Sequence, residues 1–169
     1  MSYSNKYRRR FEAFRSQAEP QESPIYLISI KPVYAHQIFQ GTKKYELRRN
    51  ARIEPGSTMV VYVSGHVRAV VGEFDVGRVI EGSPQEVWSA VTKSSGHGIG
   101  RDAWRYIKNG RTAVALEVAS RRLYPRRVTL EEIRRIIPGW MPPMSYKRLY
   151  EGDPFYELIV KRLRMLIGR

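Results

Sequence analysis

Lys43, Glu46 and Arg48 are the residues whose types and close spacing could do chemistry. A lysine and a glutamate that are both partly shielded from water pair or shift each other's pKa, and such pairs are common at functional sites. The carboxylate of Glu46 can then activate water as a general base, while Lys43 or Arg48 stabilises a developing oxyanion. Glu73 is a second candidate carboxylate. If the protein is an enzyme, we therefore expect Lys43, Glu46 and Glu73 to be catalytic.

The same charges also fit a simpler interpretation. Charged side chains on an edge strand form surface salt-bridge clusters, and such strands alone are poor predictors of a site. The two interpretations differ in geometry. A site needs the side chains to converge in an open hollow beside a curled sheet, whereas a surface cluster would leave them on a convex exterior, pointing in unrelated directions.

The segment from Lys31 to Arg49 must position these charges. It follows an apolar run that predicts a strand, and Pro32 suits the first turn of a helix, where its missing N–H costs nothing. Apolar residues continue at helical spacing until Gly41, which ends the helix. Residues 44–49 then alternate between charged and apolar types, which predicts a strand with the charges on one face. A strand, a short helix and a second strand thus bring several charges together at one opening.

The rest of the chain predicts further strands with helices inserted among them. Glycines 72 and 77 predict bends in one long strand, Ser83 with Glu86 forms a capping box, and Thr129 caps a later helix. We expect strands over 58–64, 67–80 and 112–123, and helices after Ser83, over 102–109 and from Thr129 to Pro138-Gly139. Because no βαβ unit repeats, we predict an α+β fold with a curled, mainly antiparallel sheet and flanking helices.

Three regions divide the chain. Residues 1–24 are expected to form a basic N-terminal arm or helix with a linker, which either packs on the domain or contacts nucleic acid. Residues 25–150 form the domain. Residues 151–169 have apolar residues at helical spacing, so we expect an amphipathic basic helix packed on the domain.

The chain is strongly basic. Lys and Arg number 30 against 16 Asp and Glu in 169 residues, a net charge of +14, which favours an anionic partner. Nucleic acid is the first candidate and an anionic membrane surface the second, although arginine is also used simply as a surface cation. There is no cysteine, and the three histidines lie far apart, so we expect no metal and no cofactor. With no apolar run of about 18 residues and no signal sequence, we expect no membrane span and a cytoplasmic protein.

Several short motifs resemble one family. Ser29-Ile30-Lys31-Pro32, followed by Gly41-x-Lys43-x-x-Glu46-x-Arg48, resembles the signature of ASCH domains, a branch of the PUA-like β-barrels. Later segments also resemble that family, in the same order along residues 25–150: Pro55-Gly56, Val61-Tyr62-Val63-Ser64, Val71-Gly72-Glu73-Phe74 and Pro142-Pro143-x-Ser145-Tyr146. The resemblance implies a PUA-like barrel with helices beside it and a cleft lined by Lys43, Glu46 and Arg48, with Lys31 close by.

The resemblance also implies a class of ligand. ASCH and PUA-like domains are generally linked to RNA or modified nucleosides; some members remove an acyl group from a modified cytidine, and others have nuclease activity. In that amidohydrolase branch a threonine hydroxyl is the nucleophile, and Glu46 stands at the position we align with it. The same chemistry is therefore not implied here, because the hydroxyl is missing. Resemblance of fold does not settle the reaction.

Two functional hypotheses follow. The first is an RNA-binding or modified-nucleoside-binding module, with DNA as an alternative partner, because RNA is held by cations and by aromatics that stack on its bases. Its candidate contacts are Lys31, Lys43, Arg48, Arg49, Arg52, Ser64, Arg68 and Tyr146. The second is a hydrolase that uses Lys43 and Glu46 on RNA or on an acylated cytidine. A partner-binding or membrane-surface protein is a weaker third hypothesis, and the oligomeric state stays open.

Overall fold

A computed structural model describes residues 22–169, and the predicted N-terminal arm falls almost entirely outside them. Six strands form one sheet in the order β2-β5-β4-β3-β1-β6. Their bounds are β1 Ile25–Ile30, β2 Tyr45–Arg49, β3 Thr58–Val63, β4 Ala69–Gly82, β5 Ala113–Thr129 and β6 Tyr146–Leu149. Within these residues β1 and β3 pair in parallel, and every other neighbouring pair is antiparallel. The predicted mainly antiparallel sheet is confirmed.

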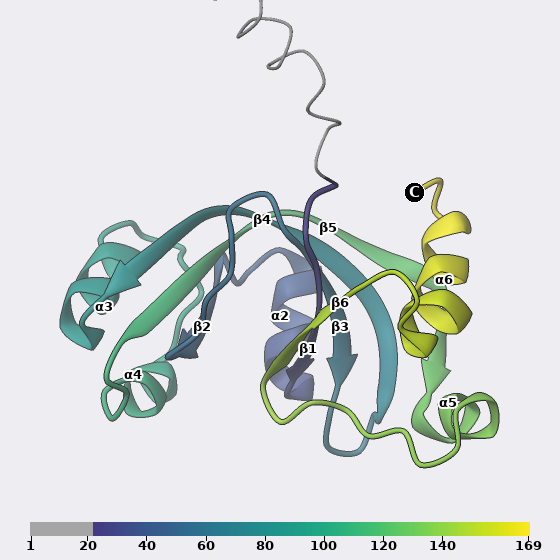
Figure 1. Cartoon of the computed structure of the whole chain (residues 1–169). Coiled ribbons are helices and arrows are strands. Elements are labelled where there is room, and N and C mark those ends of the chain that lie inside the picture. The colour runs from purple at the N-terminus through teal and green to yellow at the C-terminus, as the bar shows by residue number, and fades with distance from the viewer. Residues whose placement is uncertain (1–21) are drawn as a thin grey trace, which may run out of the picture.

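The two long strands β4 and β5 curl the sheet. They pair from Ala69–Thr129 to Gly82–Ala113, with register shifts near Gly72 and between Val76 and Val79. A Cβ on Gly72 would lie 2.3 Å from the carbonyl oxygen of Arg122, so the close approach of the strands there needs glycine. Figure 1 shows both strands arching across the whole molecule. The result is a half-barrel, with β2 and β6 as its edges.

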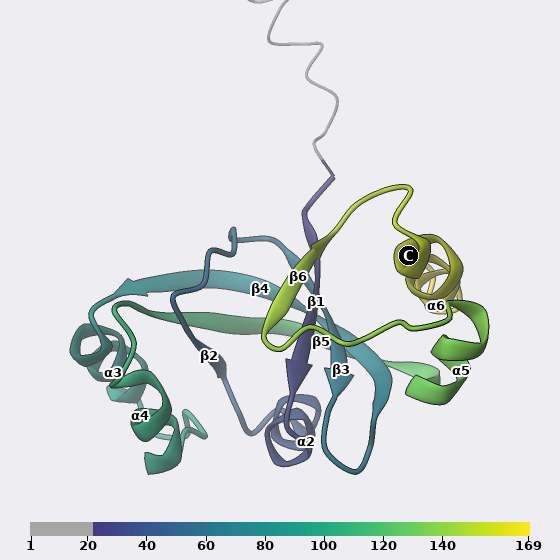
Figure 2. The same ribbon diagram turned by 60° about the horizontal axis from the view of Figure 1, so that its bottom comes forward.

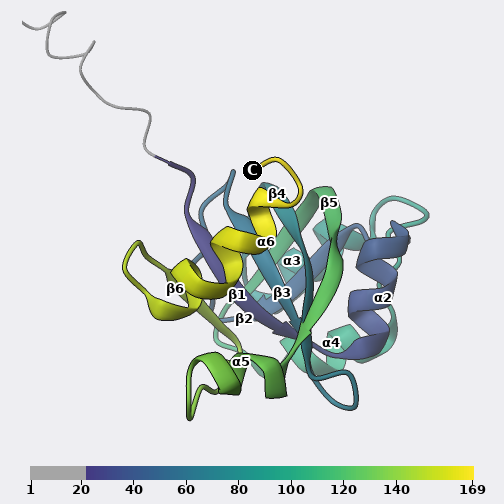
Figure 3. The same ribbon diagram turned by 90° about the vertical axis from the view of Figure 1, so that its right-hand side faces the viewer.

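Helices cover the two ends and the middle of this sheet. They are α2 Pro32–Gln40, α3 Pro84–Thr92, α4 Arg101–Ile107, α5 Leu130–Ile136 and α6 Lys161–Met165, the last preceded by a π-helical turn, Tyr156–Val160. Figures 1 and 3 place α3 and α4 at one end, α5 and α6 at the other, and α2 between them. The predicted capping box at Ser83 is present, and the predicted cap at Thr129 takes the form of a capping box with Glu132. Helix α2 ends at Gly41 in the left-handed conformation, as predicted.

Each group of helices seals its own apolar cluster. Ile38 of α2 packs with Ile28, Val61 and Phe74 in the middle, whereas Ile107 of α4 packs with Leu47 at one end. At the other end, the C-terminal segment buries Phe155, Ile159 and Leu163 against Leu27, Val60 and Tyr124. No helix in residues 22–169 is long and apolar enough to cross a membrane. Because they are anchored this way, α4 holds a fixed position beside β2, and α2 holds one beside β3 and β5.

Most element bounds agree with the prediction to within two residues, and two elements differ by more. Strand β5 runs six residues beyond the expected end at 123, because Val128 and Thr129 still pair with Val70 and Ala69 of β4. The arginines and Pro125 in that stretch hid its strand character. The C-terminal helical segment runs over residues 154–165, inside the predicted region 151–169.

Candidate functional site

A cleft with a cavity volume of about 570 Å³ opens where the curled sheet fails to close. Its walls come from β2 on one side and from β1 with the loop before β6 on the other, and Figure 2 shows these strands facing each other there. Helix α4 and the start of α2 complete the rim. The lining residues are Ser29, Ile30, Lys31, Tyr34, Lys43, Glu46, Leu47, Arg48, Tyr62, Ser64, Asp102, Ala103, Tyr106, Pro142, Pro143 and Met144.

Lys43, Glu46 and Arg48 converge in the wall of this cleft. Lys43 Nζ lies 2.7 Å from one carboxylate oxygen of Glu46, and Arg48 Nη2 lies 2.9 Å from the other. The three residues are only 6%, 4% and 7% exposed. Two cations thus hold one carboxylate, and the group keeps one net positive charge at the cleft.

The environment of Glu46 keeps it ionised. Burial by itself raises the pKa of its carboxyl, but the nearby charges of Lys43 and Arg48, with their hydrogen bonds, outweigh burial and leave that pKa below the ordinary value of 4.5. A carboxylate with a low pKa and both oxygens engaged by cations is a weak general base at neutral pH. The trio of Lys43, Glu46 and Arg48 is therefore better suited to placing positive charge than to abstracting a proton.

Arg48 also spans the open side of the sheet. Its Nη2 donates a hydrogen bond of 2.8 Å to the carbonyl oxygen of Ser29 on β1. Its Nε is buried and has no hydrogen-bond partner within residues 22–169. A buried donor without an acceptor is costly, so this guanidinium retains capacity for one more acceptor.

Tyrosines surround the cations at the mouth of the cleft. Lys43 Nζ lies 4.6 Å from the ring centroid of Tyr34, and the Tyr34 hydroxyl donates to Asp102 of α4. Tyr106, one helical turn after Asp102, is 39% exposed, and the guanidinium of Arg49 lies 4.7 Å from its ring centroid. Tyr106 therefore offers a partly exposed ring beside a cation, and such rings can stack a base.

The other residues singled out from the sequence divide into two groups. Lys31 and Ser64 line the cleft, and Arg49 lies at its rim over Tyr106. Tyr146 does not line it; its hydroxyl instead accepts a hydrogen bond of 3.0 Å from the backbone N–H of Arg52, which is a second link across the open side of the sheet. Arg52 and Tyr146 therefore hold the edges together in this structure.

Glu73 and Arg68 lie away from the trio. Glu73 is fully buried under the C-terminal helix, where Tyr124 donates to it at 2.9 Å and Arg164 and Arg169 lie within 3.1 Å. The structure thus does not bring Glu73 into one cleft with Lys43 and Glu46. Arg68 lines a neighbouring hollow behind Ser64.

Sequence reasoning missed the contribution of α4 and of the loop before β6. Trp104 and Ile107 predict the helix and pack inward, but its opposite face carries Asp102 and Tyr106 into the cleft. Their spacing of four residues places them on one helix face, and this is the signal that could have paired them. Nothing local indicates that the face lies against residues 43–48.

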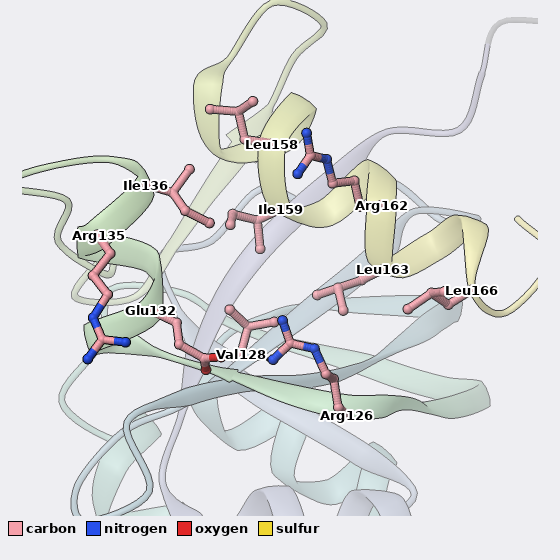
Figure 4. A pocket seen from close by; sticks show the side chains of 10 residues that line it. All are labelled: Arg126, Val128, Glu132, Arg135, Ile136, Leu158, Ile159, Arg162, Leu163 and Leu166. Carbon is pink, nitrogen blue, oxygen red and sulfur yellow. Dashed lines mark hydrogen bonds and ion pairs between the residues drawn. The ribbon is translucent and has the colours of Figure 1, made fainter.

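A further hollow of about 310 Å³ lies at the other end of the sheet (Figure 4). It is bounded by α5, the end of β5 and the C-terminal helix, with Val128, Ile159 and Leu163 on its floor. Arg126 and Arg135 at its rim are already paired with Glu132 and Glu131. Its largely aliphatic lining gives a polar ligand few partners.

Comparisons with known proteins give one family match and several structures of similar fold. The family described as "ASCH domain" matches residues 28–138. Among solved structures, ASCH from Zymomonas mobilis superposes with a TM-score of 0.67 at 21% identity, covering 80% of this chain and 94% of that one. The N-terminal domain of Staphylothermus marinus McrB gives 0.51 at 16% identity, with 82% and 93% covered, and a hypothetical protein from Leishmania major gives 0.51 at 14%, with 87% and 98% covered. At these identities the structures show the fold alone. A search of curated proteins gives no match.

Proposed function

We propose, from the premise that this chain belongs to the ASCH domain family, that its cleft binds single-stranded RNA or a modified nucleotide without transforming it. The family is generally linked to RNA, and this gives the ligand class. The observation that carries the proposal is the buried trio: one carboxylate holds two cations in the wall of an open cleft and leaves a net positive charge there. A phosphate or a base acceptor matches that charge.

The groups around the trio support such a ligand. Lys31 is exposed at the mouth, and Tyr106 offers its ring there. Single-stranded nucleic acid binds through just these two elements, cations for the backbone and aromatic faces for the bases. The cavity volume of about 570 Å³ falls within the range of small-molecule sites and suits one nucleotide.

Hydrolysis is the second candidate function, because Lys43 Nζ and a carboxylate oxygen of Glu46 lie 2.7 Å apart in the wall of the cleft. Two features weigh against it. The pKa of Glu46 is lowered rather than raised, and Glu73 is remote. A reaction would need another base.

The test of binding uses residues at the cleft mouth, whose replacement leaves the trio intact. Labelled single-stranded RNA is titrated by fluorescence polarisation against the wild type, Lys31→Glu and Tyr106→Ala, with Lys93→Glu on the exposed end of α3 as the matched charge control. We expect tighter binding at low salt than at high salt and about a tenfold loss for each cleft variant. Binding that is insensitive to salt, or equal losses for Lys93→Glu, would refute a cleft-specific role.

Catalysis is tested separately. The wild type and Glu46→Gln are incubated with single-stranded RNA and with an acylated cytidine, and products are separated by chromatography. We expect no turnover from either protein. Turnover by the wild type that is lost in a folded Glu46→Gln protein would establish the hydrolase instead, whereas equal turnover by both would remove Glu46 from the mechanism.

A further inference from the structure

A second polar hollow lies next to the cleft, between the turn from β3 to β4 and the first turns of α5. It has a volume of about 390 Å³. Two arginines, Arg68 from the turn and Arg134 from α5, face it with exposed side chains. The other lining residues are His66, Val67, Thr129, Leu130 and Glu131.

The hollow and the cleft share a wall. Tyr62 and Ser64 line the cleft, and the chain then turns directly into His66 and Arg68 of the hollow. The charges of Arg68 and Arg134 both act on the Tyr62 hydroxyl, where they partly offset the rise in pKa that burial causes. Both cations therefore lie close to the cleft wall.

The loop after α5 makes a second connection. Arg134 Nε donates a hydrogen bond of 3.0 Å to the carbonyl oxygen of Trp140, whose ring meets that of Tyr62 edge-on at 5.9 Å. The same loop continues into Pro142 and Pro143 of the cleft. Among residues 22–169, this contact engages one nitrogen of Arg134 and leaves the terminal nitrogens of its guanidinium without a hydrogen bond.

The turn holds Arg68 in place. Its backbone has φ of 47°, a left-handed conformation that is uncommon outside glycine, and its carbonyl oxygen accepts a 2.8 Å hydrogen bond from the N–H of Leu130. Glu131, the one acidic residue among the described residues that line the hollow, is already paired with Arg135 of the same helix. The hollow thus presents two exposed guanidinium groups, one of them on a fixed backbone, and its acidic lining residue is already paired.

We propose that this hollow is a phosphate subsite for the nucleotide next to the one in the cleft. The ligand is then a single-stranded oligonucleotide rather than a free nucleoside, an inference that rests on the proposed function of the cleft. Guanidinium forks match phosphate oxygens. The strand crosses the shared wall at Tyr62 and Ser64 and places a backbone phosphate between Arg68 and Arg134.

The experiment compares ligands of different length. Uridine 5′-monophosphate and oligouridylates of increasing length are titrated against the wild type, Arg68→Gln with Arg134→Gln, and a control pair, Lys93→Gln with Arg111→Gln. Both pairs remove two exposed positive charges, but neither control residue lines the cleft or the hollow. Arg68→Gln alone serves as a further variant that keeps the hydrogen bond between Arg134 and Trp140.

We expect the wild type to bind the oligonucleotides at least tenfold more tightly than the mononucleotide. The hollow variants should lose that gain while their affinity for the mononucleotide changes less than about twofold. The slope of log K against log salt should become shallower by about 0.7 for each phosphate that the variant no longer neutralises. Arg68→Gln alone should lose part of the gain.

Three results would overturn the subsite. Equal affinity for ligands of all lengths would overturn the subsite. Equal losses of affinity in the hollow pair and in the control pair would overturn it too. In both cases the cleft would still bind a nucleotide. Absence of binding to any ligand would overturn both the subsite and the proposed function of the cleft.

Discussion

Arg48 on β2 donates to the carbonyl oxygen of Ser29 on β1 across the open side of the half-barrel, at 2.8 Å. The two strands are not neighbours in the sheet, so the side chain makes a connection that the backbone does not. Arg48 also pairs with Glu46, which is itself held by Lys43. The width of the cleft and the placement of its charge therefore depend on the same guanidinium.

Replacing Arg48 by lysine should cost stability although the charge is kept. A single ammonium on a flexible stem does not reproduce the planar fork that reaches both Glu46 and Ser29. We expect the free energy of unfolding to fall by about 2 kcal/mol, the scale of a hydrogen bond to a charged group. Urea denaturation measures it.

Arg52→Lys is the control for that change, since Arg52 is exposed and contributes its backbone N–H rather than its side chain to the link with Tyr146. This substitution should change the free energy of unfolding by no more than about 0.5 kcal/mol. Equal stabilities for the Arg48→Lys and Arg52→Lys proteins would show that the bridge to Ser29 carries no energy.

Replacing Glu46 by glutamine should destabilise the fold more strongly. The substitution leaves Lys43 and Arg48 buried without their counter-charge, and removing one partner of a buried ion pair typically costs about 3–5 kcal/mol. Glu81→Gln, at an exposed position on β4, is the control and should be near neutral. Comparable midpoints for the two variants in urea would contradict the assigned role of the carboxylate.

The curled, mainly antiparallel sheet and its family could be predicted from sequence because local signals agree. Alternation over residues 44–49, the glycines of β4 and the helix caps at Ser83 and Thr129 each act within a few residues, and the structure has all of them. The ASCH resemblance rests on motifs spread along the domain, and the family match over residues 28–138 confirms it.

The composition of the cleft could be predicted only in part. Lys43, Glu46 and Arg48 are close in sequence, so one strand and the residues before it bring them together. The positions of Glu73 and Tyr146 depend instead on long-range strand pairing. The register of β4 against β5 puts Glu73 opposite Arg122, and Tyr146 lies on β6, which pairs with β1 at the sheet edge. Sequence spacing carries no information on which face such a residue meets.

A different prediction concerns Glu73, because this residue anchors the C-terminal segment. Its carboxylate is fully buried and meets Arg164, Arg169 and the Tyr124 hydroxyl. Glu73→Gln removes the charge that these arginines face, so we expect a loss of about 3–5 kcal/mol and faster hydrogen exchange in α6. Exchange measured by mass spectrometry on the full chain locates the change.

The control for the anchor is Glu151→Gln, which changes an exposed carboxylate just before the C-terminal helix. It should leave exchange in α6 unchanged. If Glu73→Gln loosened the α3 and α4 end as much as α6, the carboxylate would support the sheet in general rather than the helix.

The pH dependence of stability separates a paired Glu46 from a catalytic one. The pKa of its carboxyl is lowered in the folded protein from the ordinary value of 4.5, since the cations outweigh the effect of burial. A lowered pKa contributes stability that is complete above pH 4.5 and is lost as the pH falls through the folded value. The stability difference between the wild type and Glu46→Gln should therefore be constant from pH 6 to pH 8 and shrink only below about pH 4.5. Urea unfolding across that range measures it, and a difference that already narrows between pH 7 and pH 5 would mean a raised pKa, which is the property of a general acid or base.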